Sequence, residues 1–274
     1  MPTIDPSPLA AYQGEPGAFS EQAAWNLIGH DTPLLPCRTL GDVFEAVSAG
    51  RAGQAVVPFE NTLAGTVPRS YELLLEHRLT AVAETCVRVE HMLIAHPRAK
   101  ASAIRRVLSH PVALDQCRDY LRARGLEPVP VFDTAGAVGA VMDDTDRTVA
   151  AIASRRAAAI HGAAILAEGI QDHAENWTRF LQLVPAPGAA PLGGRKAMVV
   201  FELSHACGSL ARALQTVAAL GLNLTKVESR PIPGRPFEYA FLVEMTCGDV
   251  PPRWTEWLST LAGVTFDLRL VATF

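Results

Sequence analysis

The sequence predicts an α/β protein with two domains: a larger, two-lobed domain with mostly parallel sheets, and a smaller ferredoxin-like βαββαβ unit. Two observations predict the domains themselves. Strand-like and helix-like segments alternate up to residue 184, which is typical of parallel α/β pairing, whereas the last segments follow the order β-α-β-β-α-β. A third observation, a segment rich in Pro and Gly (PAPGAAPLGG), separates the two patterns as a linker would.

Local sequence signals predict where the helices and strands of the larger domain begin and end. Residues 11–13 form a short strand that enters a Gly-containing turn, and Ser20 is expected to cap a helix that ends near residue 27. A helix over residues 42–49 stops at Gly50, and Pro111 suits the first position of a helix over residues 112–124. The remaining strands are expected over residues 54–58, 82–94, 104–109, 129–132, 148–153 and 181–184, and the remaining helices over residues 69–77, 135–142 and 155–161.

The smaller domain is compact in sequence. Its strands are expected over residues 197–203, 223–229, 239–245 and 265–272, and its helices over residues 209–220 and 253–261. Such a unit leaves a sheet edge open and commonly pairs with a copy of itself. We therefore expect a catalytic domain over residues 10–184, a linker over 185–195 and a second domain over 196–274.

Composition excludes several classes of function. The net charge is −4, so there is no basic surplus for nucleic acid, and an anionic substrate would need a local cluster of donors. The five cysteines form no CxxC pair and the eight histidines no HExxH motif, so no metal site is expected. No segment reaches the roughly 18 apolar residues of a membrane span, and the first residues do not resemble a signal peptide. We expect a reduced, cytoplasmic protein.

Known cofactor motifs are also missing from the sequence. There is no GxGxxG after a strand, no P-loop and no GxSxG turn, so we expect a site that works without a nucleotide, a metal or a covalent nucleophile. Because ligands of parallel α/β domains bind beyond the carboxyl ends of the strands, the site should lie where the loops gather there. Chemistry that needs only a proton donor and carboxylate binding is what remains.

Four polar clusters stand at such junctions. Residues 14–20 combine two glycines with a helix start, which suits an anion, although a plain turn is equally compatible. Residues 58–65 include Asn61 and Thr62 directly after a strand, where an Asx turn is the alternative. Ser109 precedes His110, which we expect at most to position other groups; by its place Ser109 could simply be an N-cap, and Gln116 follows on the helix.

The fourth cluster covers residues 172–180 and contains Asn176, Thr178, Arg179 and Phe180. The guanidinium of an arginine matches a carboxylate in a bidentate geometry, and Thr178 presents a hydroxyl beside it. An arginine in a surface loop is usually just solvated, and that alternative would be preferred if the cluster stood alone.

Taken together, the four clusters resemble the prephenate dehydratase family. The resemblance is carried by YQGEPGAFSEQAA, VVPFENTLAGTV, SHPVALDQC and, most specifically, NWTRFLQL, and it spans residues 11–274. The resemblance implies a periplasmic-binding-protein-like catalytic domain with its active site between the lobes, in the monofunctional form of the enzyme. The implied reaction converts prephenate to phenylpyruvate, with loss of water and carbon dioxide, in phenylalanine biosynthesis and without a cofactor.

The resemblance also implies roles for individual residues. Thr178 is tied to catalysis, and we expect its hydroxyl to donate a hydrogen bond to the leaving oxygen, because a threonine is a poor acid. Arg179 is expected to bind a substrate carboxylate. The residues expected to bind the substrate are Asn61, Thr62, Ser109, Gln116, Asn176 and Phe180. Val112 departs from the glutamine that the family often has at this position.

The segments GLNLTKVESRP and PFEYAFLVE resemble the ACT domain that accompanies this family. The resemblance implies phenylalanine binding at a dimer interface, feedback inhibition and a homodimer or homotetramer. Effector-binding residues are expected at Gly208, Leu210, Glu228, Ser229, Arg230 and Pro231. The usual Pro-Gly-Ala-Leu loop reads Cys207-Gly208-Ser209-Leu210 here, so the ligand choice stays open. Two alternatives to prephenate dehydration also stay open: arogenate as the substrate, and a non-catalytic amino-acid sensor.

Overall fold

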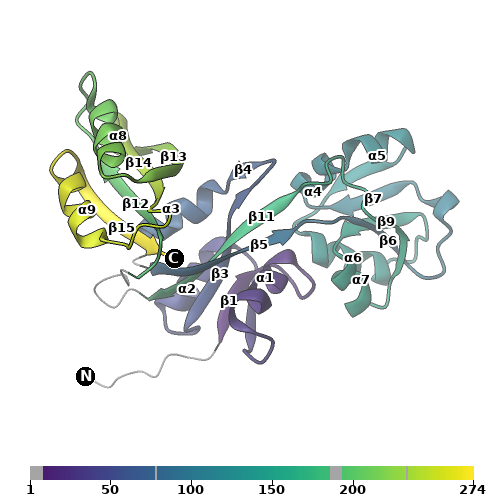
Figure 1. The fold of residues 1–274 in the computed structure, drawn as a ribbon. Helices are drawn as coiled ribbons and strands as arrows, with labels where there is room; N and C mark the ends of the chain where they lie inside the picture. Colours follow the sequence, from purple (N-terminus) through teal and green to yellow (C-terminus); the bar gives the residue numbers. More distant parts are fainter. Residues whose placement is uncertain (1–8, 78, 186–192, 233) are drawn as a thin grey trace. The chain divides into compact units, whose positions relative to one another are not determined.

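A computed structural model describes residues 9–77, 79–185, 193–232 and 234–274 (Figure 1). The chain divides into two compact units, the first within Met1–His77 and Glu84–Leu183 and the second within Arg78–Ala83 and Val184–Phe274. Most of the expected linker, residues 186–192, lies outside the described residues. The second unit also includes Arg78–Ala83, and so takes in the start of the strand over residues 82–94 that the sequence pattern assigned to the larger domain.

The first lobe of the first unit is built on a mixed sheet. The strand order is β11-β3-β1-β2, with β4 on β3 and the end of β5 beside β11. Strand β1 runs parallel to β2 and β3, whereas β11 is antiparallel to β3. The strands are β1 (Ala10–Gln13), β2 (Leu34–Cys37), β3 (Gln54–Asn61), β4 (Gly65–Thr66), β5 (Leu79–Arg88) and β11 (Trp177–Pro185). The helices are α1 (Phe19–Ile28), α2 (Leu40–Ser48) and α3 (Pro68–Glu76).

The second lobe has a sheet of its own, in the order β10-β6-β9-β7-β8. Its strands are β6 (Met92–Ala95), β7 (Arg106–Ser109), β8 (Glu127–Pro130), β9 (Val149–Ala153) and β10 (Ala164–Ala167). The helical segments are η1 (Ala101–Ala103), α4 (Pro111–Gln116), α5 (Arg118–Ala123), α6 (Thr134–Asp143) and α7 (Arg155–Ile160). Alternate residues of β6 and β9 pack into two separate apolar clusters, one with α6 and α7 and the other with α4 and α5. Helices therefore cover both faces of this sheet.

The predicted α/β class is confirmed, and several details differ from the sequence pattern. Both sheets are mixed rather than mostly parallel, since β6 is antiparallel to β9 and β10. The expected helix over residues 112–124 is divided at Cys117. Helix α1 is not capped by Ser20: Ala18 is its N-cap, and the Glu21 carboxylate instead accepts a hydrogen bond from the Gly17 N–H at 2.8 Å. Strands β2, β4 and β10 were not expected.

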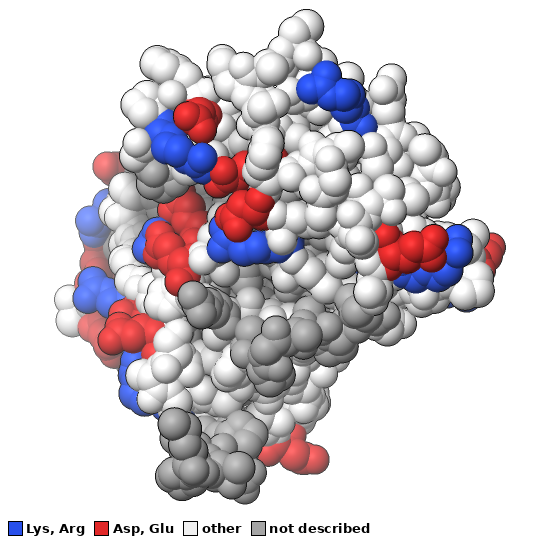
Figure 2. Space-filling view, turned by 90° about the vertical axis from the view of Figure 1, so that its left-hand side faces the viewer, with Lys and Arg blue, Asp and Glu red and all other residues white. Residues whose placement is uncertain are grey.

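The second unit has the expected βαββαβ order. Its elements are β12 (Lys196–Glu202), α8 (Ser209–Ala219), β13 (Asn223–Ile232), β14 (Arg235–Thr246), α9 (Trp254–Ala262) and β15 (Phe266–Thr273). The strands lie in the order β13-β14-β12-β15, and the helices pack on one face over a core that includes Phe201, Trp254 and Trp257. On the face drawn in Figure 2, which is largely uncharged, several blue basic side chains lie next to red acidic ones. Among the described residues, no helix is long and apolar enough to cross a membrane.

Candidate active site

A cavity of about 460 Å³ lies between the two lobes of the first unit. The first lobe contributes residues from the loop after β1, from the end of β3 and from the start of β11, whereas the second contributes residues from α4 and from the segment before α6. Four residues expected to act on the substrate line it: Asn61, Gln116, Thr178 and Phe180. The cavity therefore lies at the carboxyl ends of β1 and β3, where the loops were expected to gather, and also at the start of β11.

The hydrogen bonds of Asn61 determine how the Thr178 hydroxyl is presented. The two residues pair across β3 and β11, and Asn61 Nδ2 donates to Thr178 Oγ1 at 3.0 Å and to Asn176 Oδ1 at 2.8 Å. Asn61 Oδ1 accepts from the backbone N–H groups of Leu63 and Ala64, both at 2.9 Å, so the orientation of its amide is defined. Because Thr178 Oγ1 accepts a hydrogen bond from Asn61, its own hydrogen is available for a group in the cavity.

Arg179 is not among the residues that line the cavity. Successive residues of a strand point to opposite faces, and the cavity is lined by Thr178 and Phe180. The Arg179 guanidinium instead forms ion pairs with Glu60 at 2.8 Å and with Glu84 at 3.0 Å, and its side chain is 12% exposed. The expectation that Arg179 binds substrate is thus corrected: two protein carboxylates already occupy its guanidinium.

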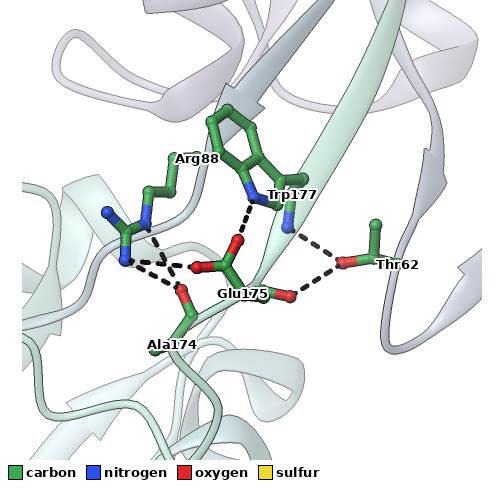
Figure 3. Close-up of polar contacts among 5 residues, drawn as sticks. All are labelled: Thr62, Arg88, Ala174, Glu175 and Trp177. Carbon is green, nitrogen blue, oxygen red and sulfur yellow. Dashed lines mark hydrogen bonds and ion pairs between the residues drawn. The ribbon is translucent and has the colours of Figure 1, made fainter.

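Thr62 holds the segment before Thr178 rather than lining the cavity (Figure 3). Its hydroxyl accepts from the Trp177 backbone N–H at 3.0 Å and donates to the Glu175 carbonyl at 3.3 Å. The Trp177 indole donates to the Glu175 carboxylate at 3.1 Å, and Arg88 donates to the Ala174 carbonyl at 3.1 Å. These bonds attach the incoming segment to the loop after β3 and to the end of β5.

Two further expected residues are buried away from the cavity. Ser109 is fully buried, and its hydroxyl donates to the Ile152 carbonyl at 2.7 Å. Ser109 therefore does not cap α4; His110 does so, because its Nδ1 accepts from the Val112 N–H at 3.3 Å. Asn176 is also fully buried and hydrogen-bonds to two residues that line the cavity, accepting from the Asn61 amide and from the Val89 backbone N–H, both at 2.8 Å.

His91 is a cavity residue that the sequence pattern did not indicate. It lies between β5 and β6, is 2% exposed, and its Nε2 lies 2.9 Å from Gln116 Oε1. Burial lowers the pKa of the His91 imidazole, so the neutral ring is favoured. Among the described residues its Nδ1 has no hydrogen-bond partner, and because an amide oxygen only accepts, a neutral ring with its proton on Nε2 can donate to Gln116 Oε1. The one feature of the sequence that could have identified His91 is its position between two apolar strands.

The expected effector residues lie in two places of the second unit. Gly208 is the N-cap of α8 with a φ of 80°, which a glycine adopts without strain, and Leu210 lines a cavity of about 340 Å³ together with Tyr239 and Phe241. The residues expected on β13 are not among those lining this cavity: Glu228, Ser229, Arg230 and Pro231. Two of the latter, Glu228 and Arg230, form an ion pair with each other.

Comparisons with known proteins identify the family. A family profile described as prephenate dehydratase matches residues 10–187. The chain is 41% identical over 245 residues to arogenate dehydratase/prephenate dehydratase 2 of Arabidopsis thaliana, a match that covers 85% of this chain and 64% of that protein. The chain thus spans less than two thirds of that relative's length.

Two solved structures resemble the chain over nearly all of its length. The prephenate dehydratase from Arthrobacter aurescens, in complex with L-Phe, is 29% identical with a TM-score of 0.86, and the match covers 97% of this chain and 90% of that one. A protein described as a novel type of quorum-quenching acylase is 33% identical with a TM-score of 0.86, and the match covers 96% of each chain.

The same comparisons correct the expected compartment. The relative from Arabidopsis thaliana and two others from that plant are named chloroplastic. These names point to the plastid rather than the cytoplasm, so the prediction of a cytoplasmic protein is wrong. Composition and cysteine usage report the redox state of the surroundings and do not identify the compartment.

Proposed function

We propose that this chain, which belongs to the prephenate dehydratase family and is therefore a carbon–oxygen lyase, converts prephenate to phenylpyruvate in phenylalanine biosynthesis. The observation that carries the proposal is the Thr178 hydroxyl, which accepts from Asn61 and has a hydrogen available at the cavity between the lobes. A positioned donor of this kind suits a reaction in which negative charge develops on a leaving oxygen.

The reaction needs little more from the protein than binding and one donor. The bond between the ring and its carboxylate breaks, and carbon dioxide leaves. The electron pair of that bond moves into the ring as the bond to the hydroxyl oxygen breaks, and the departing hydroxide gains a proton and becomes water. The ring becomes aromatic, which drives the reaction. Thr178 stabilises the charge on the leaving oxygen, Asn61 orients the Thr178 hydroxyl, and Gln116 orients the substrate.

The geometry favours this reaction over acyl transfer. A nucleophilic hydroxyl needs a neighbouring base that accepts its proton. The group that Thr178 Oγ1 meets is the amide nitrogen of Asn61, which is a donor and cannot accept a proton. The arrangement therefore suits a hydroxyl that donates, as dehydration requires.

The decisive experiment measures two reactions in parallel. With prephenate as the substrate, the ultraviolet absorbance of phenylpyruvate reports its formation. With arogenate as the substrate, the appearance of phenylalanine is measured. The two substrates differ at the side chain, a keto acid in one and an amino acid in the other. We expect prephenate to have the higher kcat/KM. A higher kcat/KM for arogenate would reassign the substrate, and binding without turnover of either would favour the amino-acid sensor.

Regulation by phenylalanine is the second part of the proposal. The second unit is proposed to be an ACT domain, and its cavity beside Gly208 is proposed to bind the amino acid. The L-Phe complex of the Arthrobacter aurescens protein supports this choice of ligand. Addition of phenylalanine to the full chain should lower the rate of dehydration, and Leu210→Asp should abolish that inhibition while leaving the rate without phenylalanine intact. Persistent inhibition in this variant would place the effector elsewhere.

The assembly is proposed to be a homodimer or homotetramer, since ACT-like units leave a sheet edge open. Light scattering of the purified chain should give a mass of two or four subunits. A monomeric mass with and without phenylalanine would contradict this part of the proposal and leave the catalytic part untouched.

A further inference from the structure

The cavity contains one permanently cationic side chain among its described lining residues, Arg38. Prephenate carries two carboxylates, and an anion that leaves water needs a cation or several donors in return. Arg179 cannot serve, because Glu60 and Glu84 already bind its guanidinium. We propose that Arg38 binds a carboxylate of the substrate; this inference rests on the proposed function.

The surroundings of Arg38 leave its N–H groups available. It follows β2 in the first lobe, and its guanidinium carbon lies 4.7 Å from the centre of the Phe132 ring, which belongs to the second lobe. Stacking on an aromatic ring uses the face of a guanidinium and leaves the in-plane N–H groups open to a carboxylate. No ion pair holds Arg38 in the part of the chain that the structure describes, and at Asp42 the pKa is lowered mainly by hydrogen bonds from Thr39.

The other charged group that lines the cavity, the Asp133 carboxylate, already accepts a hydrogen bond from the protein. Asp133 caps helix α6, and its Oδ1 accepts from the Gly136 N–H at 2.6 Å. A carboxylate at a helix N-terminus is partly compensated by the helix dipole, which weakens its repulsion of an incoming anion. At the reacting end, the Thr178 hydroxyl is a neutral donor, and the Asn61 amide already donates to Thr178 and Asn176. Charge complementarity to a dianion therefore depends on Arg38.

The test compares Arg38→Gln with Arg98→Gln, which removes the same charge from an exposed arginine outside the cavity. Arg38→Gln should raise the KM for prephenate about tenfold with kcat nearly unchanged, because a charge-assisted hydrogen bond made in both ground and transition states is lost. The KM of Arg38→Lys should lie between the KM of the natural chain and that of Arg38→Gln, since lysine keeps the positive charge but loses the bidentate geometry of the guanidinium. Arg98→Gln should match the natural chain.

A binding measurement separates this inference from the proposed function. In a Thr178→Val background, where turnover is expected to be about 10²–10³-fold slower, calorimetry with prephenate should show a Kd about tenfold weaker when Arg38→Gln is added. Equal Kd values with and without Arg38→Gln would overturn the inference even if dehydration is confirmed. Weakened binding by Arg38→Gln, together with no turnover by the natural chain, would instead refute the function and keep the carboxylate site.

Discussion

The two faces of β11 differ although the residues on them are neighbours in sequence. On the cavity face, Thr178 has a hydroxyl hydrogen available to a ligand. On the opposite face, Arg179 is shielded from solvent and bound by two carboxylates. A family motif places both residues together, but the strand separates them: Thr178 lines the cavity, and Arg179 forms ion pairs with residues of two other strands. Sequence adjacency therefore does not imply a shared role.

The largest effect should come from the cavity face. Thr178→Val removes the donor to the leaving oxygen and should lower kcat by about 10²–10³-fold, the usual loss for one positioned donor. Thr178→Ser keeps a hydroxyl and should recover much of the rate. Thermal unfolding should show both variants to be folded. A Thr178→Val enzyme with the natural kcat would remove this hydroxyl from the mechanism.

The next effect concerns the hydrogen bond that directs Thr178. Asn61→Asp keeps an oxygen for the N–H groups of Leu63 and Ala64 but replaces the amide donor with a carboxylate. The Thr178 hydroxyl would then donate to the introduced carboxylate instead of the substrate, and kcat should fall about 10–100-fold. Steady-state kinetics with prephenate measures this, and an unchanged kcat would show that Asn61 does not set the direction of the hydroxyl.

The opposite face should respond in stability more than in chemistry. Arg179→Met removes the cation that pairs with both Glu60 and Glu84 and should lower the free energy of unfolding by about 2 kcal/mol, reduced from the value for fully buried pairs because both carboxylates are partly exposed. Urea unfolding measures it. Adding Glu60→Gln and Glu84→Gln should restore part of the loss. If Arg179→Met instead raised KM with full stability, the guanidinium would belong to the substrate site.

The smallest effect is a dependence of stability on pH at His91 in the cavity wall. Its folded-state pKa is lowered by burial from the ordinary 6.5, so the unfolded chain binds more protons below that pH. The free energy of unfolding should therefore be fully retained above about pH 6.5 and fall as the pH drops toward the folded pKa, with a slope of at most about 1.4 kcal/mol per pH unit. His91→Asn should flatten this slope, whereas His173→Asn, at an exposed site, should not. Equal slopes in the two variants would contradict the buried neutral ring.

Much of the fold followed from local patterns. The order of strands and helices in the second unit, the alternation in the first and the Pro- and Gly-rich segment are all local features, so periodicity and turn residues predict them. Short strands such as β2 (LLPC) and β10 (AILA) were missed because four residues carry too little periodicity. The helix over residues 112–124 was predicted as one piece because its division at Cys117 follows from packing and not from a helix-breaking residue.

The sequence by itself determined the α/β class and indicated Asn61, Gln116, Thr178 and Phe180, which the structure brings to one cavity. Only the tertiary structure decided that Arg179 meets Glu60 and Glu84, that Ser109 bonds to Ile152, and that His91 and Arg38 line the cavity. The physical reason is the separation in sequence of the residues that interact. Which face of a strand a residue occupies depends on where the strand starts and on its register with distant strands, and an ion pair depends on residues about a hundred positions apart, such as Arg179 and Glu84.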